Sequence, residues 1–269
     1  MARNKNFSAK MRWWRKQRGI SQLDLAYRAG ISQRHISFLE LGRSEPSREM
    51  IELIASALNV PLREHNALLV AAGYAPVWRE TNLGAPELAE IRRALNYILT
   101  QQEPYPAVVV DRRWNLLMAN GGAAGLIDFL VGPLTPGAKV NLADALIAPD
   151  ILRPFLLNWK DVAGYFIRSV EADAAADGTD ETAALLKRLT AYDGVQALNT
   201  ASLANPSAPV LPMHFQKGDT SLSLFTTIAT LGTPQDITLQ ELRIESFFPM
   251  DNGTDEVLRA WGSKRGRRP

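Results

Sequence analysis

Cysteine is absent from the 269 residues of this chain, and long apolar runs are absent too. Without cysteine the chain can form no disulfide bond, no thiolate metal site and no thiol nucleophile. No apolar run approaches the roughly 20 residues that cross a bilayer, and residues 1–7 lack the apolar segment of a signal peptide. We therefore expect a cytoplasmic protein with no membrane partner.

Histidine is scarce as well. His35, His65 and His214 are the three in the chain, and they do not have the spacing of metal ligands. The glycines in residues 121–125 lack the spacing of a dinucleotide-binding loop, and the sequence contains no phosphate-binding loop or nucleophile motif. We expect no metal, no cofactor and no catalytic residues, so an enzyme is the least favoured interpretation.

The overall charge is nearly balanced, with 30 Lys and Arg against 28 Asp and Glu, but the charges are segregated. Residues 1–80 hold 13 basic and 7 acidic side chains, residues 81–258 hold 12 and 21, and residues 259–269 hold 5 basic and no acidic ones. A basic amino-terminal part suits DNA, because bound cations displace the counterions of the phosphates, whereas an acidic part is repelled. The chain length indicates about two domains.

Two short helices around a glycine turn are predicted between Ser21 and Leu41. Ser21 is a suitable N-cap, and Asp24 at the third helical position offers a carboxylate to the free amide end. Gly30 supplies the backbone freedom of a tight turn, and Ser32 can cap the second helix. This pattern predicts a helix-turn-helix, the alternative being two ordinary surface helices with a solvated polar face.

Polar side chains remain on the outer face of the second helix. Gln33 and Arg34 are of the types that hydrogen-bond adenine and guanine edges in the major groove, and Ser37 suits a phosphate or a base. Phe38 can touch a thymine methyl group but cannot read donors and acceptors, which limits the bases specified directly. We expect Arg12 on the preceding basic helix to contact phosphates.

Further helices are predicted on both sides of this motif. One covers about residues 8–18, another follows the cap Ser47, and a fifth follows Pro61 and ends at Gly73. Five short helices within about 75 residues resemble the phage-repressor and Cro-type fold. In that fold the positions of Arg15 and Glu40 form an ion pair that ties the first helix to the recognition helix.

A different pattern begins after the prolines that bracket residues 76–86. A helix is predicted for residues 87–102, which either packs on its own domain or forms a dimerising coil, although two heptads are few for a coil. The strands are predicted at residues 107–110, 114–119, 212–216, 221–230 and 241–248, with helices over residues 140–199. In the last strand Glu241, Arg243 and Glu245 alternate with apolar residues, which predicts one wet face. The order resembles a PAS-type sensor, an antiparallel sheet with helices on one side, so the expected fold class is α+β.

Several motifs together resemble the MmyB-like branch of the XRE-type bacterial transcriptional regulators. They are Met11-Arg-Trp-Trp-Arg15, Ser32-Gln-Arg-His-Ile-Ser-Phe-Leu-Glu40, Pro104-Tyr-Pro-Ala107, Asp111-Arg-Arg-Trp-Asn115, Leu231-Gly-Thr-Pro234 and Glu245-Ser-Phe-Phe-Pro249. The resemblance implies a sequence-specific DNA-binding transcriptional regulator with a PAS-like ligand-binding domain that accepts a small, apolar, fatty-acid-like molecule. The DNA-contact residues expected from the pattern and the resemblance are Gln22, Gln33, Arg34, Ser37, Phe38, Arg43 and Arg12.

The expected organisation is a helix-turn-helix domain at residues 1–80, a linker and connecting helix at 81–104, a PAS-like domain at 105–255 and a basic tail at 256–269. The expected partners are a double-stranded DNA operator, a small apolar ligand and a second copy of the chain, because operators are commonly two-fold sites. Within that tail, the segment Lys264-Arg-Gly-Arg-Arg268 is expected to be solvated, or else to serve nucleic acid or a partner protein that controls the regulator.

Apolar side chains of the second domain are the candidates for a ligand pocket. They are Trp114, Leu116, Phe155, Trp159, Tyr165, Phe166 and Phe225. The alternative for each residue is a close-packed core with no cavity, in which case the second domain is purely structural.

Overall fold

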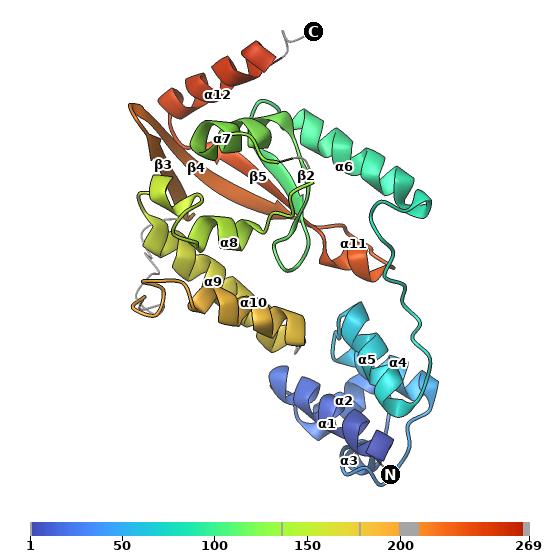
Figure 1. The fold of residues 1–269 in the computed structure, drawn as a ribbon. Helices are drawn as coiled ribbons and strands as arrows, with labels where there is room; N and C mark the ends of the chain where they lie inside the picture. Colours follow the sequence, from blue (N-terminus) through green and yellow to red (C-terminus); the bar gives the residue numbers. More distant parts are fainter. Residues whose placement is uncertain (1, 136, 178, 199–209, 266–269) are drawn as a thin grey trace. The chain divides into compact units, whose positions relative to one another are not determined.

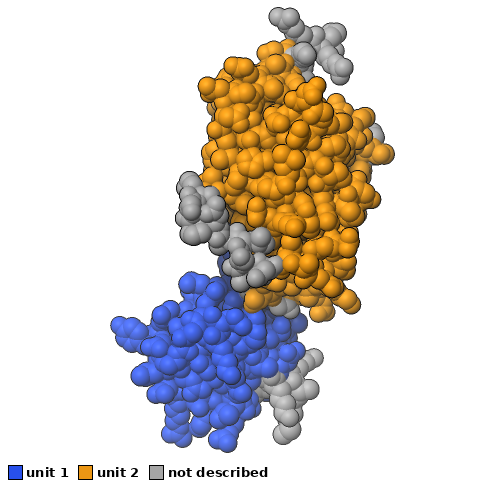
Figure 2. Space-filling model, turned by 90° about the vertical axis from the view of Figure 1, so that its left-hand side faces the viewer, with its two compact units in different colours: residues 1–81, 233–240 blue, residues 82–232, 241–269 orange. Residues whose placement is uncertain are grey.

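A computed structural model of the chain describes residues 2–135, 137–177, 179–198 and 210–265. The chain divides into two compact units (Figures 1 and 2). Unit 1 holds residues 1–81 together with residues 233–240, and unit 2 holds residues 82–232 and 241–269. The sequence analysis placed residues 233–240 in the second domain, so the division differs from the expected one at this segment.

Unit 1 is built from short capped helices. They are α1 (Ala2–Gln17), α2 (Gln22–Ala29), α3 (Gln33–Glu40), α4 (Arg48–Ala57) and α5 (Leu62–Ala72). The side chains of Ser21, Ser32 and Ser47 each accept a hydrogen bond from the amide three residues later, so each helix begins where the cap predicts. Helix α1 begins six residues before the expected Ser8.

Apolar positions at helical spacing form the core of unit 1. Phe7, Met11 and Trp14 on α1 are buried together, and they pack in one cluster with Leu25 of α2 and Ile36 of α3. Side chains three, four and seven positions apart lie on one helix face, so this face of α1 packs in the core and leaves Arg12 and Lys16 exposed.

A segment far along the chain completes unit 1. The carboxylate of Asp236 accepts hydrogen bonds from the Thr81 hydroxyl at 2.6 Å and from the Thr81 amide. The Gln240 side-chain oxygen accepts a bond from the amide of Leu62, at 2.7 Å. Residues 233–240 include most of helix α11 (Ile237–Glu241) and connect two strands of unit 2.

Unit 2 contains a five-stranded antiparallel sheet in the order β2-β1-β5-β4-β3. Its strands are β1 (Ala107–Val110), β2 (Leu116–Ala119), β3 (Pro212–Lys217), β4 (Thr220–Ala229) and β5 (Arg243–Pro249). The helices are α6 (Ala89–Gln101), α7 (Gly121–Val131), α8 (Leu142–Ile147), α9 (Trp159–Asp177), α10 (Asp180–Thr190) and α12 (Asn252–Arg265), with single 3₁₀ turns η1 (Pro86–Leu88) and η2 (Arg153–Phe155). The predicted α+β fold class is confirmed.

Both faces of strand β1 are buried. Val108 and Val110 belong to the main core cluster of unit 2, whereas Ala107 and Val109 point to the other face and are equally inaccessible. Helix α6 contacts β1 and buries its own Leu95 and Leu99. Helix α6 therefore packs within unit 2. It covers the face of the sheet that carries Ala107 and Val109, whereas the sequence predicted helices on one side of the sheet only.

The wet face predicted for the last strand is wrong. Strand β5 begins at Arg243, after Glu241 has ended helix α11, and it pairs with β1 on one side and β4 on the other. Glu245 lies opposite Val108 and is 2% exposed. Because Glu245 pairs with Val108, it shares the face of the sheet that carries the main core cluster of unit 2, and helices cover that face.

Residues 256–265 of the expected basic tail are helical, whereas the expectation of a solvated segment concerned residues 264–268, whose side chains lie outside the described part of the chain. Helix α12 extends to Arg265, with Leu258 buried. The ring of Trp261 lies 4.9 Å from that of Phe129 on helix α7. Apolar residues at helical spacing among the basic ones hold this helix on its own unit.

Candidate functional sites

The turn between α2 and α3 has the geometry of a helix-turn-helix. Ser21 Oγ accepts a hydrogen bond from the Asp24 amide at 3.0 Å, and the Asp24 carboxylate accepts one from the Ser21 amide at 3.1 Å. Gly30 ends α2 with φ at 66°, a left-handed conformation that glycine adopts without strain. The local sequence therefore sets where α3 begins and how it leaves the turn.

Helix α3 has one buried and one accessible face. Ile36 and Leu39 are fully buried, whereas Gln33 and Arg34 are exposed and Ser37 is half-buried. The predicted base-reading side chains thus lie on the accessible face. Arg43, another of the expected DNA contacts, is exposed just after the helix.

Arg34 and Phe38 interact with each other on this face. The guanidinium carbon of Arg34 lies 5.3 Å from the centre of the half-buried Phe38 ring. A cation over an aromatic face is attracted by the ring electrons. Phe38 therefore restrains the direction of the arginine, a role that the sequence analysis did not assign to it.

The carboxylate of Glu40 connects α3 to α1 and α2. Its Oε1 lies 2.6 Å from Arg15 Nε, so the expected ion pair is present, and its Oε2 accepts hydrogen bonds from Arg15 Nη2 at 3.0 Å and from Gln22 Nε2 at 2.8 Å. Although burial alone raises the pKa of Glu40, the bonds from Arg15 and Gln22 outweigh it and hold that pKa below its usual value. Glu40 is 3% exposed and charged at neutral pH.

Two of the expected DNA contacts belong to this network. Gln22 donates to Glu40, and Arg12 donates from Nη2 to the Glu40 backbone carbonyl. The sequence does not reveal these bonds, because the spacing of residues along one helix does not show which groups of another helix lie beside them. The geometry gives both a part in positioning α3.

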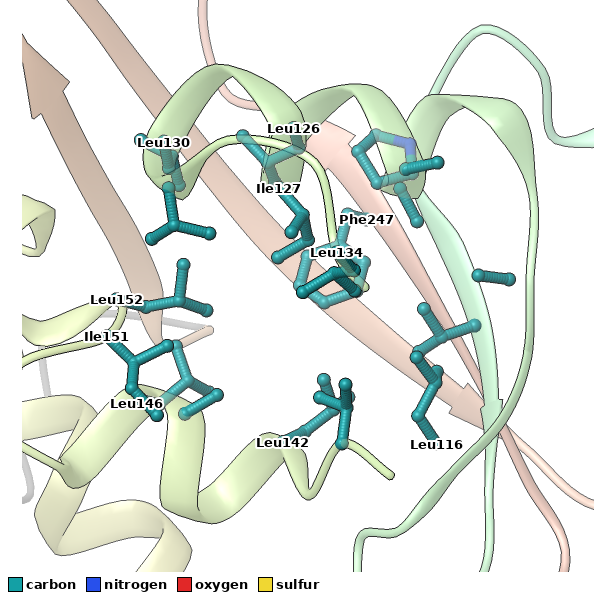
Figure 3. A pocket seen from close by; sticks show the side chains of 18 of the residues that line it. Leu116, Leu126, Ile127, Leu130, Leu134, Leu142, Leu146, Ile151, Leu152 and Phe247 are labelled. Carbon is teal, nitrogen blue, oxygen red and sulfur yellow. The ribbon is translucent and has the colours of Figure 1, made fainter. Parts of the chain in front are cut away.

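An apolar cavity of about 150 Å³ lies in unit 2 between α7, α8 and the sheet (Figure 3). Its wall is formed by Pro106, Val108, Leu116, Ala119, Ala123, Ala124, Leu126, Ile127, Leu130, Val131, Leu134, Val140, Leu142, Ala145, Leu146, Ile151, Leu152, Met213, Phe215, Glu245 and Phe247. Among these residues Glu245 alone carries a polar side chain. A cavity with such a wall admits an apolar molecule and offers little to water.

The rim of this cavity, the larger of the two described for unit 2, is apolar as well. Val131, Leu134 and Ile151 line it and are at the same time among the exposed large hydrophobic residues of the chain. Leu134 and Ile151 flank the open space in Figure 3. Exposed apolar side chains around a cavity are what an entering alkyl group would contact first.

A smaller cavity of about 120 Å³ also lies in unit 2, beside strand β5. It is lined by Tyr165, Phe166, Val210, Leu211, Met213, Thr226 and Glu245, so the two cavities share Met213 and Glu245. Burial raises the pKa of the Glu245 carboxyl to about 7, although a hydrogen bond from Thr226 and the charge of Arg243 each lower it. Its Oε2 has no hydrogen-bond partner among the described residues.

The predicted ligand residues coincide only in part with these cavities. Leu116 lines the larger cavity, and Tyr165 and Phe166 line the smaller one. Four residues line neither and have other contacts. Trp114 is fully buried with its ring 4.6 Å from Phe166, Trp159 stacks on Arg153, Phe155 lies near Lys217, and Phe225 stacks on Phe248.

Size explains why most of the aromatic candidates lie outside the cavities. Large aromatic side chains bury much area and therefore also suit a close-packed core, which was the alternative for each residue. The larger cavity is walled mostly by leucine, isoleucine and alanine of α7 and α8. The sequence signal for this space is the run of small residues at 121–125 in α7, of which Ala123 and Ala124 line the cavity.

The described residues contain no cluster of three His, Cys, Asp or Glu side chains that could hold a metal ion. None of the helices in the described part of the chain combines the length and apolarity needed to cross a membrane.

An accessible recognition helix in one unit and an apolar cavity in the other are the features of a DNA-binding regulator with a ligand-binding domain. Family models agree with that class. A helix-turn-helix model matches residues 11–65, and the model of the MmyB-like transcription regulator ligand binding domain matches residues 91–260. The second match covers more than half of the chain, which therefore belongs to the MmyB-like transcription regulators. These are regulator families rather than enzyme families.

Two solved structures show weaker similarity. The clp gene regulator ClgR from Corynebacterium glutamicum is 24% identical over 38% of this chain and 95% of its own, with a TM-score of 0.24. An RNA-binding light-oxygen-voltage receptor is 10% identical over 97% of this chain and 61% of its own, with a TM-score of 0.29. No curated protein sequence matches the chain significantly.

Proposed function

We propose that this regulator reads its operator through Gln33, Arg34 and Ser37, and that an alkyl-chain molecule in the larger cavity changes its affinity for that operator. The observation that carries the ligand proposal is the cavity wall, which is apolar except for Glu245. A fatty-acid-like molecule, as expected from the sequence, has the apolar chain that such a wall favours.

The volume of the cavity limits the ligand. An engineered protein cavity of roughly 150 Å³ lined by leucine, isoleucine and phenylalanine stays dry and binds benzene. The larger cavity has about this volume, so it holds about six carbon atoms, and a longer chain has to continue past the apolar rim at Leu134 and Ile151. Octyl compounds are therefore suitable probes.

A second copy of the chain is part of the proposal. Helix α3 has eight residues and presents its polar face over a short length, so one copy contacts only a few base pairs. Two copies would read a two-fold site about one DNA turn apart. Sedimentation velocity of the full chain with and without operator tests this, and a 1:1 complex on the selected operator would contradict it.

The chain itself suggests how the ligand affects the DNA-binding unit. Strand β5 carries Glu245 and Phe247 of the cavity wall, and it follows residues 233–240, which belong to unit 1. The bonds of Asp236 to Thr81 hold that segment. A ligand that shifts β5 thus acts on a strand joined by a short stretch of backbone to unit 1.

Operator duplexes selected from a random library with the full chain provide the test. The dissociation constant for operator, measured by fluorescence anisotropy, is expected to change about fivefold or more with saturating 1-octanol or octanoate. Ala145→Leu fills the larger cavity and is expected to keep the ligand-free affinity while losing the response. Ala183→Leu, at an exposed position of α10, is the matched control and keeps both. An octyl compound that binds without altering operator affinity contradicts the proposal.

A further inference from the structure

Lys217 is the last residue of strand β3, and it follows two residues of the larger cavity wall on the same face of the strand. Side chains two positions apart point to one face, and on β3 this face carries Met213, Phe215 and Lys217. Met213 and Phe215 are buried and line the cavity, whereas Lys217 is exposed. A cation therefore stands where the apolar face of β3 meets water.

The contacts of the Lys217 ammonium group place it between α7 and η2. Its Nζ donates a hydrogen bond to the carbonyl oxygen of Phe129 at 2.7 Å, and it lies 5.6 Å from the ring centres of both Phe129 and Phe155. The Phe129 carbonyl is joined directly to the nitrogen of Leu130, and Leu152 lies three residues before Phe155. Leu130 and Leu152 line the cavity and lie on the same side of the open space in Figure 3. The ammonium group is thus held beside this side of the cavity wall.

The rim of the cavity belongs to the same two segments. Val131 and Ile151 line the cavity and are exposed, so a chain that outgrows the space leaves past them. Val131 lies two residues after Phe129, and Ile151 lies four residues before Phe155. Because the cavity holds about six carbon atoms, the last two carbons of an eight-carbon acid, carboxylate included, would lie at this rim.

The ammonium group has hydrogen-bonding capacity left for such a carboxylate. It carries three hydrogens, of which the Phe129 carbonyl takes one. Among the described residues Lys217 has no carboxylate partner. An anion can therefore bind to Lys217 without breaking an existing ion pair.

Two arginines near the cavity wall are engaged with other groups. The Arg153 guanidinium carbon lies 3.6 Å from the centre of the Trp159 ring. The Arg188 guanidinium is paired with the Asp144 carboxylate at 2.7 Å. Neither arginine is as free as Lys217 to accept a new anion.

The bond to Phe129 also has a purely structural explanation. The last carbonyl groups of α7 lack partners within the helix, and a lysine at a helix C-terminus satisfies one of them and complements the helix dipole. This alternative predicts no preference among ligand head groups. The preference for a head group therefore distinguishes the two roles.

We propose that Lys217 binds the carboxylate of a ligand whose alkyl chain fills the larger cavity. This rests on the proposed function, which concerns the apolar chain, and it assigns the polar end to a residue at the edge of the cavity. A carboxylate at this edge keeps part of its hydration while it gains the attraction of the ammonium group. Residues 81–258 carry an excess of acidic side chains, so a local cation also offsets their repulsion of an acid.

Acids and alcohols of equal chain length provide the test. Affinities of octanoate, decanoate, 1-octanol and 1-decanol for the full-length protein are measured by isothermal titration calorimetry at pH 7.5. Lys217→Met keeps an apolar stem and removes the charge, so both acids should bind about threefold to fivefold more weakly than to the wild type. Both alcohols should change by less than about twofold, because they make no ion pair. Retained binding of the alcohols also shows that the variant is folded.

Three further variants separate charge from shape. Lys217→Arg keeps the charge and should keep at least about half of the wild-type affinity for the acids. Lys217→Glu reverses the charge, so the acids should bind more weakly still, while octylamine should bind about threefold to fivefold more tightly than to the wild type. Lys187→Met removes an exposed cation from α10, which contributes no residue to the described cavity wall, and should leave all affinities unaltered.

The outcomes separate the two proposals. Acid and alcohol affinities that fall together in Lys217→Met, or that both stay unchanged, overturn the role of Lys217 and leave the cavity as the ligand site. Lys139 is exposed next to the cavity-lining Val140, and a selective loss of acid binding in Lys139→Met instead of Lys217→Met also overturns the proposal. If neither acids nor alcohols bind to the wild type, the ligand proposal itself fails, and the role of Lys217 fails with it.

Discussion

At the scale of single residues, two buried carboxyl groups have opposite surroundings. Glu40 receives hydrogen bonds from Arg15 and Gln22, which hold its pKa below the usual value despite burial. Burial raises the pKa of Glu245 to about 7, although Glu245 receives a hydrogen bond from Thr226 and lies near Arg243, which is paired with Asp173. The first group is charged and orients the recognition helix, and the second is poised between its two protonation states near neutral pH.

The stability of the protein should depend on pH through Glu245. Its folded pKa is raised, so the stability it contributes is present below the unfolded pKa of about 4.5 and is lost as pH rises through about 7. The groups around it are Tyr165, Thr226, and Arg243 paired with Asp173. Between pH 4 and pH 8 the ionisation of Glu245 should lower the free energy of unfolding of the wild type by about 3 kcal/mol. We expect Glu245→Gln to lack this decrease.

Urea unfolding at a series of pH values measures this effect. The difference in unfolding free energy between Glu245→Gln and the wild type should grow in favour of the variant as the pH rises from 5 to 8. Parallel pH profiles for the two proteins would show that Glu245 titrates normally.

The proposed base contact of Arg34 leads to a second prediction at the residue scale. Arg34→Ala is expected to lose about 1 to 3 kcal/mol of operator binding at one base position, because a bidentate contact to guanine is lost. Binding to random duplex should change much less. Anisotropy titrations on operator, single-base variants and random DNA measure both, and equal losses on all duplexes would contradict a base-reading role.

At the scale of elements, the connection between β4 and β5 leaves unit 2, contributes to unit 1 and returns to unit 2. Residues 233–240 lie in unit 1, while the strands on either side of them belong to unit 2. Asp236 holds the segment through the amide and hydroxyl of Thr81, and it also accepts from the Thr238 amide at the start of α11. An ordinary hairpin connection would not need such contacts.

Asp236→Ala should therefore weaken the communication between ligand and DNA. We expect octyl compounds to bind as they do to the wild type, while the ligand-induced change in operator affinity falls to about half or less, since part of a coupling of about 1 to 3 kcal/mol is lost. Anisotropy with and without 1-octanol measures the response. Asp219→Ala, in the exposed turn between β3 and β4, is the matched control. A full response in Asp236→Ala would exclude this route.

At the scale of the whole molecule, the two parts of the chain differ in net charge. The excess of basic residues lies in residues 1–80, and residues 81–258 carry an excess of acidic ones. The salt dependence of DNA binding, which reflects counterion release, should therefore depend on the basic side chains of unit 1.

The salt dependence of operator binding tests this separation. Arg43→Ala, exposed after α3, is expected to reduce the slope of log affinity against log salt by about 1 if Arg43 contacts a phosphate. Arg93→Ala, exposed on α6 in unit 2, should leave the slope unchanged. Equal slopes for Arg43→Ala and the wild type would remove Arg43 from the proposed DNA contacts.

The helices of unit 1 could be predicted from the sequence because local interactions determine where they begin and end. Caps such as Ser21 and Ser32 and the turn at Gly30 act on neighbouring residues, so the chain order alone specifies α2 and α3 and the face that α3 presents. Strands and helices of unit 2 were largely predictable for the same reason, because hydrophobic periodicity is a local property.

The cavity and its one carboxyl group were decided by the tertiary structure. Alternation along β5 predicted that Glu245 faces water, but the residue lies opposite Val108, on the face of the sheet that the helices of unit 2 cover. Likewise, a space among α7, α8 and the sheet is a property of how side chains from distant segments fail to fill a volume. The sequence by itself determined helix α3 and the polar face that we propose contacts DNA, whereas the cavity that we propose binds a ligand depends on packing between residues that are far apart in the chain.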